Sequence, residues 1–496
     1  SIMPAMPAHS GALYTAEQVR DLERRAIDEL GIPGYQLMTR AGHATLDALR
    51  ALWPAAKSIA VLCGPGNNGG DGYVVARVAR AQGLRTEVFF LDDPRQLRAD
   101  ARQAHADFVA AGGHCRPWRG EPLDVDVIVD ALFGTGLIRE ISGEAAELLR
   151  AANAAQRPIV AVDIPSGLHA DSGAVLGVAA RAELTVTFIG RKLGFYLGEG
   201  PEHVGRLVCD DLGVPPETYS VVTASASLLA ESDVVAALPR RGRLVHKGSH
   251  GHVLVIGGGP GMPGAARLAG EAALRAGAGL VTVAVHPDNL GIVAERPELM
   301  CTAARSARDL AAVLTRATVV AIGPGLGTDV WGRGQLEAAL GSGLPLIVDA
   351  DALNLIAERP RASDHWVLTP HPGEAARLLG STGRAVQADR LAAARELQAR
   401  CGGHVVLKGA GSIVQAPGDL PRICDRGNPG MAAGGMGDVL TGVIAGIAAQ
   451  CGDLALAARA GVFAHAQAGD LAARRGERGL LASDLLDQLR SCVNPC

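Results

Sequence analysis

The sequence of 496 residues has no apolar run of the roughly 18 residues that a membrane-spanning helix needs. Its net charge of −4 and its lack of a basic run with interleaved aromatic residues give no sign of a nucleic-acid surface. Residues 1–10 have neither the basic nor the apolar region of a secretory signal peptide. We therefore expect a cytoplasmic protein that binds neither membranes nor nucleic acids.

Cysteine pairs and lysines are also scarce. The nine cysteines are scattered and form no Cys-x-x-Cys pair, which predicts reduced thiols and argues against structural zinc. Among 47 basic residues only four are lysines: Lys57, Lys192, Lys247 and Lys408. Three of the four stand in glycine-rich motifs, which suggests sites that need a compact ammonium group rather than a planar guanidinium.

Hydrophobic residues make up 48% of the chain and charged residues 20%, and the length favours two or three domains with sizeable cores. Short apolar runs alternate with helical patterns in both halves, which is typical of a parallel sheet with helices on both faces. Residues 211–232 form a link that contains proline, serine and alanine, and we place the domain boundary near 220–230. The sequence therefore predicts two doubly wound α/β domains of αβα layering, at residues 12–218 and 228–496.

The expected strands are the short apolar runs. In the first half they are 58–63, 86–91, 125–133, 158–164, 183–189 and 207–209; in the second half they are 252–256, 280–285, 318–322, 345–349, 366–369, 404–408 and 412–416. The expected helices of the first half are 15–30, 35–52, 73–81, 95–111 and 143–153, the first with Thr15 as its N-cap. Ligands gather at the carboxyl ends of parallel strands, so the motifs that follow these strands are candidate sites.

Four glycine-containing motifs follow strands of the first half, at residues 64–72, 130–136, 163–167 and 190–194. The motif at 64–72 lacks the spacing of a dinucleotide-binding Gly-x-Gly-x-x-Gly fingerprint. Its two Asn amides and Asp71 favour hydrogen bonding to a sugar, a phosphate or a cation. The alternative is a plain tight turn.

Two carboxylates of these motifs follow apolar runs, where an unpaired charge is costly. Asp130 and Asp163 therefore each need a cation, a hydrogen-bond donor or a proton. Asn68, Asp130 and Ser166 offer hard oxygen ligands, which favour an alkali or alkaline-earth ion over a soft metal. The alternative is that these side chains only cap local turns.

The second half contains a glycine-rich motif at residues 432–442, in which Asp438 opens an apolar helix. Glycines let backbone N–H groups approach an anion, and the helix dipole adds positive charge at that end. We expect the same field to keep Asp438 ionised and able to accept a proton from a substrate hydroxyl. The motif thus predicts phosphoryl transfer. The alternative is a glycine-rich start of a core helix with a capping Asp.

A second anion-binding element is Lys-Gly-Ala-Gly-Ser at residues 408–412, which joins two expected strands. Its lysine and backbone amides can hold a phosphate as a point charge and a nest. Two such elements in one half predict a site for a nucleotide phosphate chain. No Gly-x-x-x-x-Gly-Lys is present, so this is not a P-loop enzyme.

Eight motifs in order now resemble those of one known family. They are residues 64–71, 130–136, 163–167, 247–251, 323–327, 349–354, 371–374 and 434–438. The chain resembles the bifunctional NAD(P)H-hydrate repair enzymes, in which a Rossmann-like epimerase domain precedes a ribokinase-like dehydratase domain. The resemblance covers nearly the whole chain, roughly residues 12–218 and 228–496.

The resemblance implies the substrates and the two reactions. The substrates would be NADHX and NADPHX, the hydrated forms of NADH and NADPH with water added at C6 of the nicotinamide ring. The first half would interconvert the R and S epimers. The second half would dehydrate the S epimer with ADP to give NAD(P)H, AMP and phosphate. Potassium in the first half and Mg²⁺ with ADP in the second would be the cofactors, and a homo-oligomer is expected.

The resemblance also implies site residues in each half. In the first half the hydrate would be bound by Asn67, Asn68, Gly69, Gly70, Asp71, Gly134, Thr135, Gly136, Leu137, Ile138, Arg139, Glu140 and Asp163, and potassium by Asn68, Asp130 and Ser166. In the second half Ala265, Gly325, His371 and Asp438 would bind the hydrate, and Lys408, Gly409, Ala410, Gly411, Ser412 and Gly437 the adenine nucleotide. Asp438 and Asp163 are the expected catalytic residues.

Two other interpretations remain open at the level of sequence. The second half could be a kinase for a small alcohol, because such enzymes share its expected fold and its Gly-x-Gly-Asp motif. The first half could bind a ligand or a protein without catalysing a reaction. A purely structural protein fits poorly with so many glycine-rich strand ends.

Overall fold

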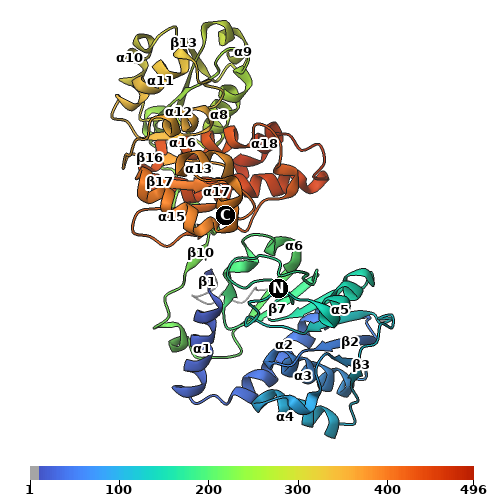
Figure 1. Cartoon of the computed structure of the whole chain (residues 1–496). Helices are drawn as coiled ribbons and strands as arrows, with labels where there is room; N and C mark the ends of the chain where they lie inside the picture. The colour runs from blue at the N-terminus through green and yellow to red at the C-terminus, as the bar shows by residue number, and fades with distance from the viewer. Residues whose placement is uncertain (1–10, 496) are drawn as a thin grey trace. The chain divides into compact units, whose positions relative to one another are not determined.

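The computed structural model describes residues 11–495, and the chain forms two compact units that divide between Ala226 and Ser227 (Figure 1). Residues 1–10, for which the sequence predicts no signal peptide, lie outside the described residues. Each unit has its own sheet and its own hydrophobic core, which confirms the prediction of two α/β folds.

The sheet of the first unit has seven parallel strands in the order β4-β3-β2-β5-β6-β7-β9. They are β2 (Ser58–Cys63), β3 (Arg85–Phe90), β4 (Arg116–Pro117), β5 (Val127–Ala131), β6 (Ile159–Val162), β7 (Leu184–Phe188) and β9 (Arg206–Asp210). Two short strands, β1 (Ala12–Tyr14) and β8 (Arg191–Lys192), pair in parallel with each other and are not part of this sheet. The strand order reverses between β2 and β5, and ligands bind at such a switch point in open α/β sheets.

Helices cover both faces of this sheet. They are α1 (Ala16–Asp28), α2 (Gly34–Leu52), α3 (Asn67–Ala81), α4 (Ala99–Ala110), α5 (Gly143–Ala154) and α6 (Gly200–Val204). In β2, Ile59 and Val61 pack with α1 to α4, whereas Ala60 and Leu62 pack with α5 (Figure 1). The alternation buries the strand on both sides. Thr15 caps α1 as predicted, in a capping box.

One prediction about this unit is wrong in a way that bears on function. The sequence predicts a helix from Tyr73, but α3 begins at Asn67. A Cβ on Gly69 would lie 2.0 Å from the Gly64 carbonyl oxygen, and one on Gly72 would lie 3.0 Å from the Cys63 sulfur. The glycines therefore let the helix start directly against the end of β2, and this packing overrides their low helix propensity.

The sheet of the second unit places seven parallel strands in the order β13-β12-β11-β14-β15-β16-β17, followed by antiparallel β18 and β19. Its strands are β10 (Ala226–Leu228, paired with β19), β11 (His252–Ile256), β12 (Leu280–Val285), β13 (Met300–Ala303), β14 (Val319–Ile322), β15 (Leu346–Val348), β16 (Trp366–Leu368), β17 (His404–Leu407), β18 (Ile413–Gln415) and β19 (Arg422–Ile423). The short strands β10, β13 and β19 were not predicted. The strand order reverses between β11 and β14.

Helices again lie on both faces. They are α7 (Glu231–Ala237), α8 (Pro263–Arg275), α9 (Leu290–Val293), α10 (Ala311–Leu314), α11 (Val330–Leu340), α12 (Ala350–Glu358), α13 (Pro372–Leu379), α14 (Gly383–Ala388), α15 (Arg390–Cys401), α16 (Met436–Cys451), α17 (Leu454–Ala472) and α18 (Ala482–Cys492). One core cluster joins α8, α16, α17 and α18 to one face of the sheet, and another joins α10, α11 and α12 to the other. The layering is thus the predicted αβα arrangement.

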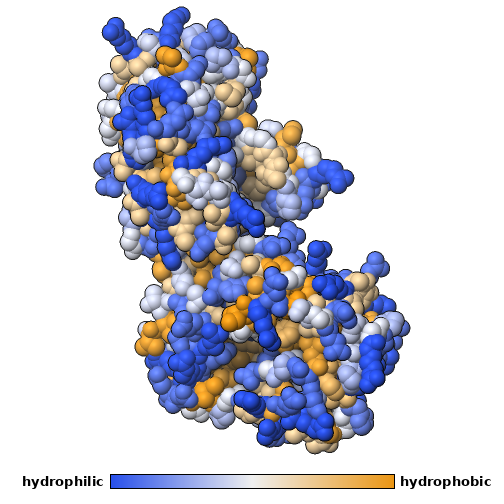
Figure 2. All heavy atoms as spheres, viewed as in Figure 1, coloured by the Kyte–Doolittle hydropathy of each residue, from blue (hydrophilic) through white to orange (hydrophobic). Residues whose placement is uncertain are grey.

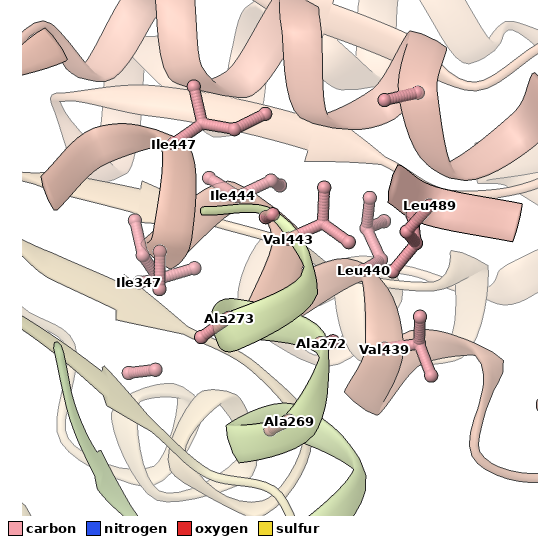
Figure 3. Packing of buried hydrophobic residues seen from close by; sticks show 14 of the residues in the cluster. Ala269, Ala272, Ala273, Ile347, Val439, Leu440, Val443, Ile444, Ile447 and Leu489 are labelled. Carbon is pink, nitrogen blue, oxygen red and sulfur yellow. The ribbon is translucent and has the colours of Figure 1, made fainter. Parts of the chain in front are cut away.

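Small residues bring α16 close to α8 (Figure 3). A Cβ on Gly442 would lie 2.1 Å from the Ala269 carbonyl oxygen, and one on Gly446 would lie 2.6 Å from the Ala273 carbonyl oxygen. The two helix backbones can therefore approach more closely than larger side chains would permit. This contact fixes the axis of α16, whose first turn carries Asp438.

The surface mixes residue types. Figure 2 shows hydrophilic and hydrophobic residues interspersed over the visible face. Within residues 11–495, every helix is too short or too polar to cross a bilayer. The eight cysteines in this range are all free thiols, as the sequence predicts.

Candidate active sites

In the first unit, two motifs meet at the switch point of the sheet. The Gly64 amide donates to the Ala131 carbonyl oxygen at 3.0 Å. A Cβ on Gly64 would lie 1.7 Å from the Leu132 carbonyl oxygen, so only glycine permits this approach. The end of β2, the start of α3 and the end of β5 therefore form one site.

The three residues that the sequence proposes as cation ligands are all buried here. Ser166 donates from its hydroxyl to Asp130 Oδ1 at 2.6 Å and from its backbone amide to Asp130 Oδ2 at 2.8 Å. Burial raises the pKa of Asp130, although its bonds to Ser166 oppose the rise. Asn68 is different, because neither its amide oxygen nor its amide nitrogen has a hydrogen-bond partner among the described residues.

The unsatisfied Asn68 amide tests whether this site fits a cation. A buried polar group without a partner is rare and points to a bound ion, water or ligand. Asn68, Asp130 and Ser166 all carry oxygen donors, and a cation at Asp130 would also stabilise its buried negative charge. The residues therefore fit a hard cation.

The other residues expected to bind the hydrate surround the same point. Asn67 to Asp71 form the first turns of α3, where free backbone N–H groups and the helix dipole favour an anion. A Cβ on Gly134 would lie 3.5 Å from the Asn68 Cβ, so the loop from Gly134 to Glu140 begins beside Asn68. Further along this loop Ile138 is 82% exposed.

The third motif supplies Asp163, which lies just past the end of β6. Its φ of 66° is left-handed, an uncommon conformation for a residue other than glycine that often marks a functional site. The buried Lys192 ammonium donates to Asp163 Oδ1 and also to Thr187 Oγ1, at 2.7 Å from the latter. The sequence reasoning did not assign Lys192 a role in the site; its signals were the scarcity of lysine and its place in the motif at residues 190–194, after an expected strand.

Two further carboxyl groups share this environment. Burial, with a contribution from Asp163, raises the pKa of Glu23 on α1 to about 7. The same two causes raise the pKa of Asp71 well above its ordinary value. Three carboxyl groups thus gather around one lysine. Glu23 was also missed, because it lies on a helix with no motif.

In the second unit, the loops after β11 and β14 cross at the switch point. The Gly258 amide donates to the Pro324 carbonyl oxygen at 3.0 Å, and the Gly259 amide donates to the Gly325 carbonyl oxygen at 2.6 Å. A Cβ on Gly325 would lie 3.2 Å from the Ala265 Cβ. The structure therefore brings together two of the residues expected to bind the hydrate.

A buried ion pair lies beside the start of α16. Lys408 donates from Nζ to Asp349 Oδ1 at 2.7 Å, and Thr441 donates to Asp349 Oδ2 at 2.8 Å. Burial opposes the charge of both partners, but their attraction outweighs it and lowers the pKa of Asp349 while raising that of Lys408. A Cβ on Gly437 would lie 3.1 Å from Lys408 Nζ. The lysine of one glycine-rich motif therefore meets the helix start of the other.

Asp438 lies in the first turn of α16, but the prediction that it stays ionised is wrong. Burial, followed by the negative charges of Asp349 and two other carboxylates, raises its pKa to about 7; the nearby Lys408 opposes the rise. The two other carboxylates are Asp351 and Glu374. Burial and like charges outweigh the helix dipole, whose effect is typically about 0.3–1 kcal/mol. Asp438 is therefore half protonated near neutral pH.

The loop 408–412 is held from behind by Arg390, which was not predicted. Its guanidinium donates to the carbonyl oxygens of Leu407, Lys408 and Gly411, each at 3.2–3.3 Å. Burial lowers the pKa of Arg390 to about 10. The Gly409 amide donates to Ser412 Oγ at 3.3 Å, so the amides of residues 410–412 are the ones that the loop offers to an anion.

His371 lies at the N-cap of α13. Its side chain is half exposed, and its Nδ1 accepts hydrogen bonds from the Gly373 and Glu374 amides, which orient the ring at the helix start. Burial and the nearby Lys408 lower the pKa of His371. Glu374 Oε2 lies 3.9 Å from Lys408 Nζ, which places His371 at the same cluster.

No metal cage of three or more His, Cys, Asp or Glu side chains occurs in the described part of the chain. The second unit therefore offers a magnesium ion no complete set of protein ligands. Mg²⁺ is commonly held by one or two carboxylates together with substrate phosphates and water.

Known proteins match both units. Residues 253–491 match the family described as NAD(P)H-hydrate dehydratase, and residues 34–194 match the family described as YjeF-related protein N-terminus. The bifunctional NAD(P)H-hydrate repair enzyme Nnr of Coxiella burnetii is 49% identical over 97% of this chain and 99% of its own length. The Nnr enzyme of Escherichia coli is 45% identical over 97% of this chain and 94% of its own length.

A solved structure also resembles the second unit. It is described as the ADP/ATP-dependent NAD(P)H-hydrate dehydratase from Bacillus subtilis co-crystallized with ATP/Mg²⁺. It is 30% identical, covers 54% of this chain and 97% of its own, and has a TM-score of 0.49.

Proposed function

The chain belongs to the family of bifunctional NAD(P)H-hydrate repair enzymes, and from this premise we propose which residues carry its two reactions. It is an enzyme that repairs hydrated NADH and NADPH. We assign epimerisation of the R and S hydrates to residues 12–218 and dehydration of the S hydrate to residues 228–496. The position of Asp438, in the first turn of α16 beside Lys408 and Gly437, is the observation that carries the proposal.

In the dehydratase, Asp438 takes the proton from the C6 hydroxyl of the hydrate. The oxygen then attacks the β-phosphate of ADP and AMP leaves, so that a poor leaving group becomes a phosphate ester. The lone pair of the ring nitrogen expels phosphate from C6, and loss of a proton from the neighbouring carbon restores the reduced nicotinamide. A base with a pKa of about 7 suits the first step at neutral pH.

The nucleotide would lie between the two anion-binding elements. Lys408 and the backbone amides of residues 410–412 would hold its phosphates, and the N–H groups around Gly437 would stabilise the charge that develops during transfer. Ala265, Gly325 and His371 would contact the hydrate. ADP as the donor is implied by the resemblance to the family, and Mg²⁺ would accompany it mainly through the phosphates; no step is assigned to the ion.

In the epimerase, Asp163 would exchange a proton with the hydrate, which residues 67–71 and 134–140 would bind. Asn68, Asp130 and Ser166 would hold potassium, because the Asn68 amide is otherwise unsatisfied and Asp130 is buried. That ion would balance the Asp130 charge and fix the loop that begins at Gly134. An Asp163→Ala variant should consume the R epimer far more slowly than the wild type, while its rate with the S epimer stays unchanged.

The alternative of a small-alcohol kinase fused to a non-catalytic domain is not favoured, since the repair enzymes match along nearly the whole chain. Incubation with ADP and hydrated NADH separates the two interpretations. A repair enzyme restores the absorbance of reduced nicotinamide and releases AMP. A small-alcohol kinase would leave the absorbance unchanged.

Two further statements stay predictions. The scattered free cysteines favour a reducing compartment, and we propose the cytoplasm on that ground. We also expect a homo-oligomer, which the resemblance to the family implies and which sedimentation velocity would test.

A further inference from the structure

The hydrogen bonds of Asp163 are concentrated on one of its two carboxylate oxygens. Oδ1 accepts from the Thr187 hydroxyl at 3.1 Å, from the Phe188 amide at 3.2 Å and from the Lys192 ammonium. Among the described residues, Oδ2 accepts no hydrogen bond, and the Asp163 side chain is 16% exposed. One oxygen is therefore fixed, and the other is free for a ligand.

The hydrogen bonds of Lys192 that the described residues show all lie within this cluster. Its side chain is fully buried, and its three ammonium protons go to Asp163, to Thr187 Oγ1 at 2.7 Å and to the Phe188 carbonyl oxygen at 3.3 Å. Its donor capacity is thus filled. Lys192 cannot reach a substrate in this arrangement, and any effect on the reaction must pass through Asp163.

The surrounding charges explain why a cation is needed at this point. Glu23 of α1 and Asp71 of α3 face Asp163, and burial together with the Asp163 charge raises the pKa of both. Cys209 of β9, opposite Thr187, is a half-buried free thiol whose pKa is raised, first of all by desolvation. Arg20 and Arg191 are further cations near the site, acting on Glu23 and Cys209 respectively. Among the cationic side chains of residues 11–495, only Lys192 forms a hydrogen bond to Asp163.

We propose that Lys192 is a positioning residue of the epimerase: together with Thr187 and the Phe188 amide it holds Oδ1 of Asp163, so that Oδ2 exchanges the proton with the hydrate. The inference rests on the proposed epimerase role of Asp163. The ammonium stabilises the negative charge of the carboxylate amid two other carboxyl groups, and the fixed Oδ1 sets the direction of Oδ2. No covalent step involves the lysine.

The test uses the full chain with Lys192→Met and, as a matched control, Lys57→Met at an exposed lysine of the same unit. Conversion of the R to the S epimer is followed by NMR, and dehydration of the S epimer by the same chain reports how much enzyme is active. We expect kcat of epimerisation to fall roughly 100-fold at pH 7, as for loss of a general base, with KM within about twofold. Lys57→Met should keep wild-type values.

The split between kcat and KM distinguishes positioning from a merely structural role. A positioning residue should change kcat of epimerisation, while KM for the hydrate and the dehydration rate of the same chain stay near their wild-type values. A loss of kcat that follows the melting temperature, or that is matched by an equal rise in KM, would overturn the proposal.

A second variant guards against failure to fold. Thr187→Val removes one donor to Oδ1 but keeps the lysine, and we expect kcat of epimerisation to fall about tenfold with little change in KM. Wild-type kcat in this variant would refute the proposal. If the wild type itself does not interconvert the epimers, the proposed epimerase function fails instead, and the two failures are thus distinct.

Discussion

Replacing Asp438 with Asn tests the dehydratase directly. The amide is nearly the same size, keeps the N-terminal turn of α16 and cannot accept a proton. General-base catalysis contributes roughly 10²–10⁴-fold to a rate, so we expect kcat for the S epimer to fall by at least about 100-fold. The first unit supplies an internal control, since interconversion of R and S should remain at the wild-type rate.

The pH dependence gives this prediction its magnitude. With a pKa of about 7, Asp438 is half ionised at pH 7 and about one-tenth ionised at pH 6. The reaction needs the ionised form, and kcat/KM reports the ionisation of the free enzyme. Wild-type kcat/KM should therefore fall about tenfold per pH unit below pH 6. The Asn variant should lack this limb. Rates are read from the absorbance of reduced nicotinamide at saturating ADP.

The same substitution should stabilise the fold at alkaline pH. A raised pKa means that the native state disfavours the charged form of Asp438. The contribution of the neutral carboxyl group to the free energy of unfolding is therefore fully present below pH 4 and is lost as the pH rises through about 7. At pH 8 the wild type carries this penalty, and the neutral Asn does not. We expect a gain of roughly 1–3 kcal/mol in the free energy of unfolding of the second unit, after allowance for partial solvent exposure.

Two outcomes would refute this reasoning. If the Asn variant keeps more than about a tenth of wild-type activity at pH 8, another group removes the proton. If the acid limb of the wild type lies below about pH 5, Asp438 titrates as an ordinary carboxyl group and the crowding by its neighbours has no functional effect.

Three further predictions concern the neighbours of these groups. Lys408→Met should leave the buried Asp349 carboxylate unpaired and lower the free energy of unfolding by about 3–5 kcal/mol, as measured by urea denaturation; an unchanged midpoint would contradict the ion pair. Gly437→Ala adds a Cβ 3.1 Å from Lys408 Nζ and should raise the KM for ADP by roughly tenfold, whereas Gly434→Ala, in open space, should not. Asn68→Ala should abolish the dependence of epimerisation on potassium, tested against choline chloride; a retained response would move the ion elsewhere.

The sequence predicts much of both sites because parallel strands align their carboxyl ends. Asp130 lies at the end of β5 and Ser166 follows β6, so the contact between these two motifs follows from topology. Asn68 opens α3 after β2 of the same sheet. Gly325 and Ala265 meet for the same reason. The start of α3 was misplaced because glycine-rich segments have low helix propensity, and only the close packing against β2 makes Asn67 helical.

The sequence could not predict the raised pKa of Asp438 or the side chains that support the two sites from other elements. Burial, together with Asp349, Asp351 and Glu374 from other elements, raises the pKa of Asp438 to about 7, and no local pattern in the sequence shows that these groups converge. Arg390 holds the loop 408–412 from a helix without a motif. Such residues act through tertiary contacts, so their roles appear only once the fold is known.

The two lysines explain why the two candidate bases behave differently. In the first unit the ammonium of Lys192 bonds to Asp163 itself and fixes one of its oxygens. In the second unit Lys408 forms its hydrogen bond with Asp349 and not with Asp438. Its positive charge therefore stabilises mainly the Asp349 carboxylate, and Asp438 remains in a buried place among negatively charged groups. Burial and these like charges raise the pKa of Asp438 to about 7, which suits it to take a proton from a hydroxyl group. The hydrogen-bond partner of each lysine therefore accounts for the difference: Lys192 orients Asp163 directly, whereas Lys408 bonds to Asp349 and leaves Asp438 with a raised pKa.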